Sequence, residues 1–299
     1  MSMIKGTYTA LITPFKEDED IDWSSLERLI EFNIDNGISG LVPCGTTGES
    51  PTLTAEEHKK VIGFVVRKAR GRVPVIAGTG SNCTREAVEF TREAGKDGAD
   101  AVLVVSPYYN KPTQEGLYLH FRKVAESTGL PVIIYNIFGR TGVNIETSTL
   151  LRLIESCPNI RNGGVKEASG NMAQIKDVIA KVPKEFSVLS GDDGLTLDVI
   201  KEGGHGVISV ASNIVPREVS SLTNNALRRI YSSAEKWDKY LGPLFKAAFL
   251  ETNPIPIKYM LSFNGMCKEV YRLPLCEMGA ENKKRVEKVM EDFNLIPYS

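Results

Sequence analysis

The chain has 299 residues, of which 42% are hydrophobic and 24% are charged, a composition typical of a globular protein that buries a large core. Its 36 basic and 37 acidic side chains nearly cancel, which argues against nucleic acid or an anionic membrane as the main partner. No run of about 18 apolar residues is present, so no transmembrane helix is expected. The first nine residues also lack the apolar core of a signal peptide.

Cysteine and histidine usage restricts the chemistry further. The five cysteines are scattered, odd in number and without a C-x-x-C pair. This pattern suits reduced thiols in the cytoplasm and argues against a simple zinc cluster. Histidines occur only at positions 58, 120 and 205, so a His-rich metal site or a Ser-His-Asp triad has few candidates. We therefore expect a cytoplasmic protein without a bound metal.

Short apolar runs alternate with amphipathic stretches over most of the chain, which indicates alternating strands and helices. The predicted strands cover residues 7–13, 40–44, 73–77, 101–105, 131–135, 160–166, 186–189 and 206–210. The helices predicted to follow them cover residues 23–36, a stretch opened by Thr54, and residues 84–96, 113–127, 147–155, 171–181, 194–202 and 216–227. Thr54 with Glu57 three residues later is the pattern of a capping box.

Strands that are apolar throughout should be covered on both faces, as in a parallel sheet. Eight strand–helix units of this kind predict an α/β fold, a (β/α)8 TIM barrel. A doubly wound sheet is the alternative, but no G-x-G-x-x-G motif follows the first strand. We therefore expect a catalytic barrel over residues 1–230 and a C-terminal helical extension over residues 231–299.

Polar residues concentrate directly after the predicted strands, where barrels of this kind build their active sites. They occupy positions 45–50, 106–112, 135–142, 166–167 and 190–193. Lys166 is the most unusual of them, because a desolvated ammonium is costly and tends to lose its proton. A neutral amine is a nucleophile toward carbonyl carbons. Taken alone, the same lysine could instead pair with a carboxylate or extend to solvent.

The turn at residues 45–48 carries Thr46 and Thr47 between two glycines. Its exposed N–H groups could hold a small carboxylate, although an ordinary turn capped by threonines fits the same letters. Arg140, in a glycine-flanked loop, could bind a carboxylate through two nitrogens or make a surface ion pair.

Tyrosines complete the set of polar residues at this predicted rim. Tyr135 ends an apolar strand, so its phenol could be buried and need a partner, or it could simply be a core residue. Tyr108 and Tyr109 could pack a loop or lie at an interface between subunits. An amine, a phenol, two hydroxyls and a guanidinium on one rim suit imine chemistry on a small keto acid.

Eight segments make the chain resemble the dihydrodipicolinate synthase and N-acetylneuraminate lyase family of Schiff-base aldolases. They are GTTGES at 45–50, AGTGSN at 77–82, SPYYNKPTQEGLY at 106–118, YN and RTG within 135–142, VKEASGN at 165–171, LSGDD at 189–193, GGHGVISV at 203–210 and NPIPIKY at 253–259. They are long and ordered as in the family. The resemblance extends from Gly6 to the C-terminal helices, and it implies chemistry that needs no metal or other cofactor.

The branch of the family that the chain resembles most condenses pyruvate with L-aspartate 4-semialdehyde in lysine (diaminopimelate) biosynthesis. The resemblance implies that Lys166 forms the imine with pyruvate. It also implies a proton relay of Thr46, Tyr135 and Tyr109, in which Tyr109 reaches in from a neighbouring subunit. The family is usually a homotetramer built as a dimer of tight dimers, and we expect that assembly here.

The resemblance assigns the binding residues as well. Thr47 would hold the pyruvate carboxylate, Arg140 would bind the carboxylate of the semialdehyde, and Gly191 and Ile208 would line the pocket. Phe138 departs from the proline that many members carry in the turn before the arginine, so the position of Arg140 could differ from theirs.

Some members bind lysine as a feedback inhibitor at the tight-dimer interface. The matching positions here are Ser50, Pro51, Ala55, His58, Asn82, Glu86 and Tyr108. Ala55 replaces a side chain that is polar in lysine-sensitive members, and His58 could equally be a plain helix residue. The resemblance therefore makes lysine inhibition plausible, with Ala55 as the departure from the lysine-sensitive pattern.

Two other functions fit parts of the pattern. A sibling aldolase, such as N-acetylneuraminate lyase or 2-keto-3-deoxy-gluconate aldolase, shares the lysine and the tyrosine. Thr46 favours the first reaction, because the neuraminate lyases tend to carry serine there. A non-enzymatic binding protein on the same barrel would need a broken relay, whereas Lys166, Tyr135, Thr46 and Tyr109 are all present.

Overall fold

The structure is a computed structural model that describes residues 3–295. Its eight strands are all parallel and follow the order β2-β1-β8-β7-β6-β5-β4-β3. A parallel bridge between Leu41 and Val75 joins β2 to the residue before β3, so the sheet closes into a barrel. The strands are β1 (Gly6–Ala10), β2 (Gly40–Val42), β3 (Ile76–Gly78), β4 (Ala101–Val105), β5 (Val132–Asn136), β6 (Gly164–Glu167), β7 (Ser187–Ser190) and β8 (Gly206–Ser209).

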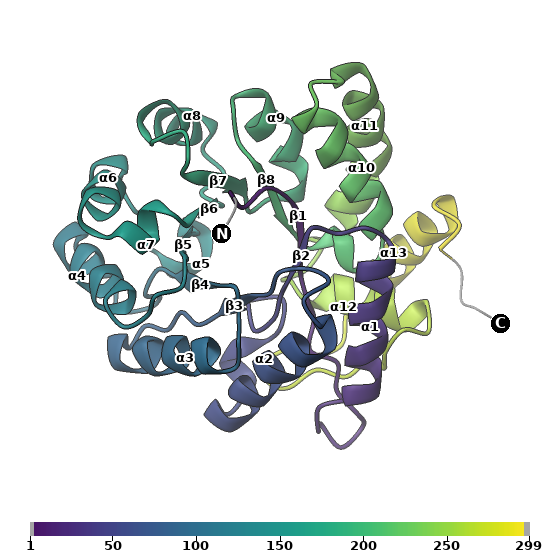
Figure 1. Cartoon of the computed structure of the whole chain (residues 1–299). Helices are drawn as coiled ribbons and strands as arrows, with labels where there is room; N and C mark the ends of the chain where they lie inside the picture. The colour runs from purple at the N-terminus through teal and green to yellow at the C-terminus, as the bar shows by residue number, and fades with distance from the viewer. Residues whose placement is uncertain (1–2, 296–299) are drawn as a thin grey trace.

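Helices surround the barrel on the outside (Figure 1), which confirms the predicted (β/α)8 architecture. Thr54 and Glu57 form the expected reciprocal capping box at the start of α2. The helices of the barrel are α1 (Trp23–Asp35), α2 (Ala55–Ala69), α3 (Thr84–Lys96), α4 (Gln114–Ala125), α5 (Phe138–Thr141), α6 (Thr147–Ser156), α7 (Pro158–Arg161), α8 (Met172–Lys181), α9 (Thr196–Lys201) and α10 (Pro216–Leu227), with the 3-10 turns η1 (Ser50–Thr52), η2 (Asp193–Leu195) and η3 (Ala211–Asn213).

The predicted strand over residues 160–166 is wrong in its first half. The short helix α7 occupies that half, with Pro158 at its first position, where a missing N–H costs nothing. Ile160 is buried as a helix residue rather than a strand residue. The strand begins only at Gly164, where a Cβ atom would lie 2.4 Å from the carbonyl oxygen of Ser187.

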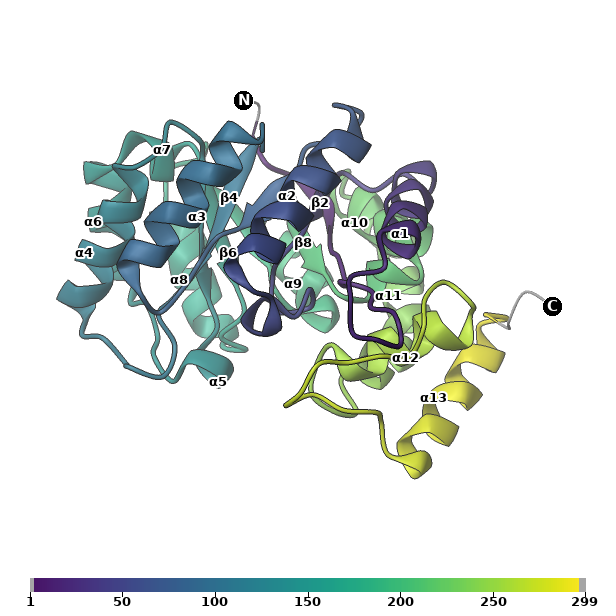
Figure 2. The same cartoon turned by 90° about the horizontal axis from the view of Figure 1, so that it is seen from below.

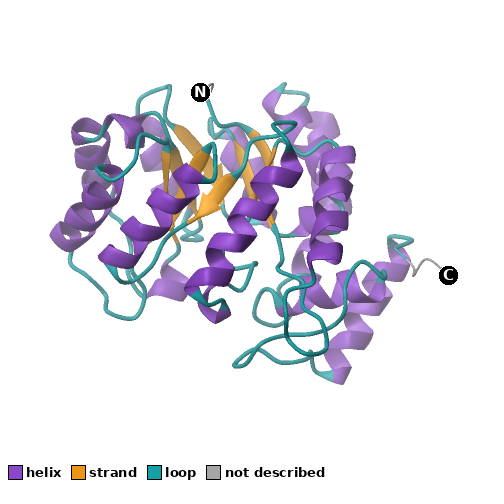
Figure 3. Cartoon of the chain, turned by 60° about the horizontal axis from the view of Figure 1, so that its bottom comes forward, coloured by secondary structure: helices purple, strands orange, loops and turns teal. Residues whose placement is uncertain are grey.

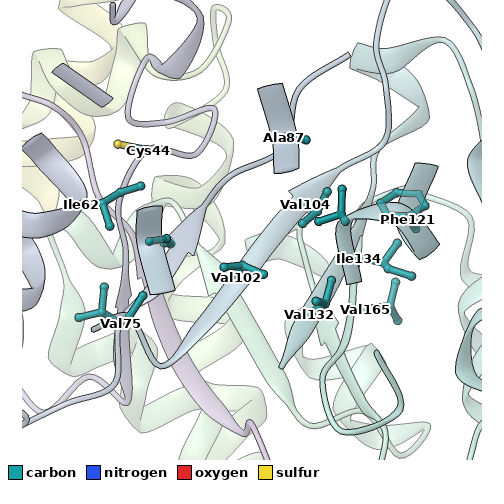
Figure 4. Close-up of a cluster of buried hydrophobic side chains, with 14 of the residues drawn as sticks. Cys44, Ile62, Val75, Ala87, Val102, Val104, Phe121, Val132, Ile134 and Val165 are labelled. Atoms are coloured by element: carbon teal, nitrogen blue, oxygen red, sulfur yellow. The ribbon is translucent and has the colours of Figure 1, made fainter. Parts of the chain in front are cut away.

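Alternation along each strand divides the core into two layers. On β4, Val102 and Val104 face the helices, while Ala101 and Leu103 face the barrel interior. Successive strand side chains point to opposite faces, so β5 repeats the pattern. Figure 4 shows part of the outer layer, between the strands and their helices. Tyr135 belongs to the inner layer, so the alternation that builds the core also directs its side chain inward.

Three further helices follow the eighth unit: α11 (Tyr231–Ala247), α12 (Ile255–Phe263) and α13 (Ala280–Asp292). Helices α12 and α13 lie at the same end of the barrel as α5 (Figure 2), the end toward which the strands run. The strands and the surrounding helices are distinguished in Figure 3. Arg272 donates hydrogen bonds to both carboxylate oxygens of Glu57 and to the Thr52 carbonyl, which fastens this part to α2.

The division into a barrel up to residue 230 and a separate extension stays a prediction, and residues 296–299 of that extension lie outside the described part. None of the helices between residues 3 and 295 is both long enough and apolar enough to cross a membrane.

Candidate active site

Lys166 lies near the end of β6 with its side chain turned into the barrel, and only 5% of the residue is exposed. Within residues 3–295, its Nζ has no ion-pair partner and no hydrogen bond. The alternative in which this lysine pairs with a carboxylate is therefore not realised within the described residues. Its recorded neighbour is the ring of Tyr135, whose centroid is 4.2 Å from Nζ.

Tyr135 is held opposite Lys166 by strand pairing, because the two residues are partners in the β5–β6 register. Tyr135 is 5% exposed. Its carbonyl accepts hydrogen bonds from the Ser106 N–H and from the Ser106 hydroxyl, at 3.0 and 3.1 Å. These bonds also tie β5 to the end of β4, so the phenol and the amine face each other from a rigid part of the sheet.

The turn that carries Thr46 and Thr47 folds back on itself after β2. The Gly48 and Glu49 N–H groups donate to the Gly45 and Thr46 carbonyls, while the Thr46 and Thr47 N–H groups make no backbone hydrogen bond within the described residues. Thr47 is buried, and its hydroxyl accepts a 2.9 Å hydrogen bond from Asn253 Nδ2. Two free N–H groups beside two hydroxyls are suited to a small carboxylate.

Arg140 lies in the short helix α5, where sequence analysis expected a loop. Its Nη2 donates a 3.1 Å hydrogen bond to the Asn253 carbonyl. The side chain of Phe138, at the first position of the same helix, is directed to solvent with 54% exposure.

A small cavity of about 50 Å³ brings together most of the expected residues. Arg140 is exposed and Lys166 is buried, and both line this cavity. The predicted site residues that line this cavity are Thr46, Thr47, Tyr135, Arg140, Lys166 and Gly191. A Cβ atom on Gly191 would lie 3.0 Å from Lys166 Cε, so glycine leaves room for the lysine side chain.

A second cavity, of about 330 Å³, adjoins the first and shares Thr46, Tyr135 and Arg140 with it. Six of the seven positions matched to a lysine site line it, namely Ser50, Pro51, Ala55, His58, Glu86 and Tyr108. The seventh, Asn82, is next to them and donates a 3.2 Å hydrogen bond to the Tyr108 carbonyl.

Electrostatics differ between the residues of this larger cavity. Burial lowers the pKa of His58 to about 4, so the ring is neutral near pH 7, and its Nδ1 has no partner within residues 3–295. Burial raises the pKa of Tyr108, and nearby Glu86 raises it further. The cavity therefore combines an exposed carboxylate with a neutral imidazole and a protonated phenol.

Two expected residues lie outside both cavities. Tyr109 is 90% exposed with a positive φ of 72° and lines neither of them. Ile208 is fully buried inside the barrel, in the same apolar cluster as Tyr135, and its role in lining the pocket stays a prediction.

The extension supplies residues that sequence reasoning did not assign. Asn253 lines the cavity of Lys166 and contacts both Thr47 and Arg140. Lys258 forms an ion pair with Glu49, directly after the threonine turn, and both side chains are 0% exposed. The only signal for either residue was the segment at 253–259, which carried the family resemblance without a role.

Between residues 3 and 295, no cluster of three or more His, Cys, Asp or Glu side chains has the geometry to bind a metal ion.

Comparisons with known proteins agree over almost the full length. A model described as the dihydrodipicolinate synthetase family matches residues 3–293. A 4-hydroxy-tetrahydrodipicolinate synthase from Endomicrobium trichonymphae is 52% identical over 294 residues, which cover 98% of this chain and 100% of that protein.

Solved structures agree equally well. The crystal structure of dihydrodipicolinate synthase from Aquifex aeolicus gives a TM-score of 0.97 at 50% identity and covers 99% of this chain and 100% of that chain. The chloride-inhibited dihydrodipicolinate synthase from Acinetobacter baumannii, solved in complex with pyruvate, gives 0.95 at 41% identity and covers 98% and 100%. The chain therefore belongs to the dihydrodipicolinate synthetase family.

Proposed function

We propose that Lys166 is the imine-forming nucleophile of an enzyme that condenses pyruvate with L-aspartate 4-semialdehyde, the reaction of a 4-hydroxy-tetrahydrodipicolinate synthase. The observation that carries this proposal is the buried Lys166 Nζ, which has no ionic partner within residues 3–295, lies 4.2 Å from the centroid of the Tyr135 ring and lines a cavity. The activity named for full-length relatives and the pyruvate complex of a structural neighbour support the substrates. The enzyme is a Schiff-base-forming lyase.

The reaction begins when the neutral amine of Lys166 attacks the keto carbon of pyruvate. Loss of water leaves a cationic imine. Loss of a methyl proton then gives an enamine, because the electron pair of the broken C–H bond forms the C=C bond and the π pair of the C=N bond moves onto the nitrogen. The enamine carbon then attacks the aldehyde carbon of the semialdehyde, and the new alkoxide takes a proton. The substrate amine finally attacks the imine carbon, which closes the ring and releases Lys166.

The neighbouring residues take the roles that their positions allow. Tyr135 and Thr46 pass protons between the reacting oxygens and solvent, and a relay of this kind contributes about 10²- to 10⁴-fold to the rate. Thr47 and the free N–H groups of its turn hold the pyruvate carboxylate. Arg140, at the mouth, binds the carboxylate of the semialdehyde as a fork of donors. Gly191 leaves the space that Lys166 occupies, and Ile208 packs beneath.

Borohydride reduction tests the nucleophile directly. The protein is incubated with pyruvate, reduced and mapped by mass spectrometry, and we expect one pyruvate adduct on Lys166. Lys166→Met should form none, whereas Lys176→Met is a matched control, because Lys176 is exposed and pairs with Glu202 on the surface. An adduct on another lysine, or none, would contradict the proposed nucleophile.

Substrate choice is tested separately by following pyruvate loss with different acceptors. We expect turnover with L-aspartate 4-semialdehyde and none with N-acetylmannosamine. Turnover with the sugar alone would assign the chain to a sibling aldolase activity instead.

We further propose that the enzyme is a homotetramer, a dimer of tight dimers in which Tyr109 of each subunit completes the relay of its neighbour. Its 90% exposure and its position outside the cavities of its own chain support this role. Tyr109→Phe and Lys166→Met should each be inactive alone. Mixed subunits should regain activity, because each mixed dimer holds one site with both residues. Failure of mixing to restore activity would refute the shared site.

Lysine inhibition is proposed for the larger cavity, where Glu86 offers a carboxylate to an ammonium group and Tyr108 lies beside it. L-Lysine should lower the rate, and Glu86→Gln should weaken that inhibition while Lys166 still forms its imine. A rate unaffected by lysine would refute the proposed inhibition. We would then attribute the insensitivity to Ala55, which replaces a polar side chain of the lysine-sensitive members.

We also propose a cytoplasmic location, supported by five cysteines that are all free.

A further inference from the structure

Asn136 and Glu167 are partners in the β5–β6 register, one position beyond the pair Tyr135 and Lys166. Because successive side chains of a strand point to opposite faces, this second pair leaves the barrel on the outside while the first pair enters it. Asn136 and Glu167 are nevertheless 1% and 2% exposed. A buried carboxylate therefore directly follows the nucleophile in sequence, on the opposite side of the sheet, and the mechanism does not use it.

Hydrogen-bond donors surround the Glu167 carboxylate. Asn136 Nδ2 donates to both oxygens, at 3.1 and 3.2 Å, and the Ser169 N–H donates at 3.0 Å. Gln174 Nε2 adds a longer contact of 3.4 Å. Burial raises the pKa of Glu167, while the bonds from Ser169, Asn136 and Gln174 act in the opposite direction. The Glu167 carboxyl oxygens thus accept hydrogen bonds from three neighbouring residues, as the acceptor character of a carboxylate requires.

Asn136 extends the same network to the loop that carries Arg140. Its Oδ1 accepts a 3.1 Å hydrogen bond from the Ile145 N–H, and its Nδ2 also donates to Asn144 Oδ1 at 2.9 Å. Asn144 Nδ2 in turn donates to Gln174 Oε1 at 2.9 Å. The network thus joins the end of β5, the end of β6, the far end of the loop over residues 137–145 and the first turns of α8.

We propose that Asn136 and Glu167 are positioning residues that hold Tyr135, Lys166 and the Arg140 loop in their reactive arrangement from outside the barrel. Neither residue touches the reacting atoms. The proposal rests on the roles proposed above for Lys166 and Tyr135. Asn136 directly follows Tyr135 and Glu167 directly follows Lys166. A shift of these strand ends would therefore move the amine of Lys166 relative to the phenol of Tyr135. A displacement of about 1 Å costs up to about 10²-fold in rate.

The test exchanges donor and acceptor without changing shape. Glu167→Gln replaces one acceptor oxygen by an amide N–H₂, which faces the N–H donors of Asn136, Ser169 and Gln174. Because two donors repel each other, we expect the ends of β5 and β6 to move apart. We expect imine formation with pyruvate, measured by rapid mixing and borohydride quenching, to slow by about 10- to 100-fold. The double variant Asn136→Asp with Glu167→Gln restores one acceptor facing one donor, and we expect it to recover most of the lost rate.

Asn159→Ala is the stability control. Asn159 Nδ2 donates to the Ala125 and Thr128 carbonyls, away from the site, so its loss should lower the unfolding midpoint without slowing imine formation. Imine formation by folded Glu167→Gln at the wild-type rate would overturn the proposal. So would a double variant as slow as Glu167→Gln, or an equal slowing in Asn159→Ala.

Two further outcomes are informative. If Glu167→Gln does not fold, Asn136→Asp alone should be slow and the double variant faster, and the reverse order would overturn the proposal. If wild-type protein forms no adduct on Lys166, the proposed function itself fails, whereas a normal wild-type adduct with an unaffected Glu167→Gln refutes only the positioning role.

Discussion

Removal of Lys258 should destabilise the protein strongly, although the ion pair that it forms contributes little net stability. Lys258 Nζ is 2.5 Å from Glu49 Oε1, and neither side chain is exposed. At an effective dielectric constant of about 20, this separation corresponds to an attraction of about 7 kcal/mol. Transfer of each ion out of water costs several kcal/mol, so the intact pair roughly balances. Without Lys258, the Glu49 carboxylate still bears the desolvation cost of burial but no longer gains the attraction of the ammonium.

Lys258→Met is therefore expected to lower the free energy of unfolding by about 3–5 kcal/mol. Burial already raises the pKa of Glu49, and without the ammonium that carboxyl should take up a proton. Glu49 ends the turn that holds Thr46 and Thr47, and its own φ is 54°. The variant should accordingly also raise the KM for pyruvate, because the turn loses the group that anchors it.

Urea unfolding followed by circular dichroism measures the change. Glu49→Gln combined with Lys258→Met should lose less stability than Lys258→Met alone, because no buried charge remains without a partner. Lys268→Met is the matched control, because Lys268 and Glu17 form an exposed pair, with 53% and 83% of their side chains accessible. Its loss should cost far less stability than the loss of Lys258, because exposed ion pairs contribute little. A Lys258→Met protein no less stable than this control would refute the reasoning.

Three further predictions concern the site and the pH dependence of stability. Gly191→Ala should slow imine formation by about 10- to 100-fold, because the new methyl would press on Lys166 Cε at 3.0 Å; a normal trapping rate would contradict this. Asn253→Ala removes the 2.9 Å bond to the Thr47 hydroxyl and should raise the KM for pyruvate by roughly 3- to 10-fold, with kcat changed less; an unchanged KM would refute it. Burial lowers the pKa of His120 from 6.5 to about 4, so between these values the unfolded chain binds the extra proton. Stability from this residue should fall by up to about 3 kcal/mol as the pH drops through that window, and His120→Asn should flatten the fall in urea titrations at pH 6.5 and 4.5.

Local patterns in the sequence were sufficient for the order of the elements. Short runs of four to seven residues marked the strands, and the capping box at Thr54 marked the start of α2. The error over residues 160–166 has a physical cause. Ile160 is buried on α7 as it would be on a strand, and a short apolar run does not distinguish the two conformations. In the structure β6 begins at Gly164, which pairs with Ser187 of β7.

The site divides in the same way. By itself, the sequence determined that Lys166, Tyr135 and the threonine turn lie at one rim, because parallel strands of a barrel end at the same face. Only the tertiary structure decided that Lys166 lacks an ionic partner within residues 3–295, that Tyr109 is exposed outside both cavities, and that Asn253 reaches back to Thr47. Periodicity records the environment of neighbouring residues, whereas a contact between positions 206 residues apart depends on how every intervening element packs.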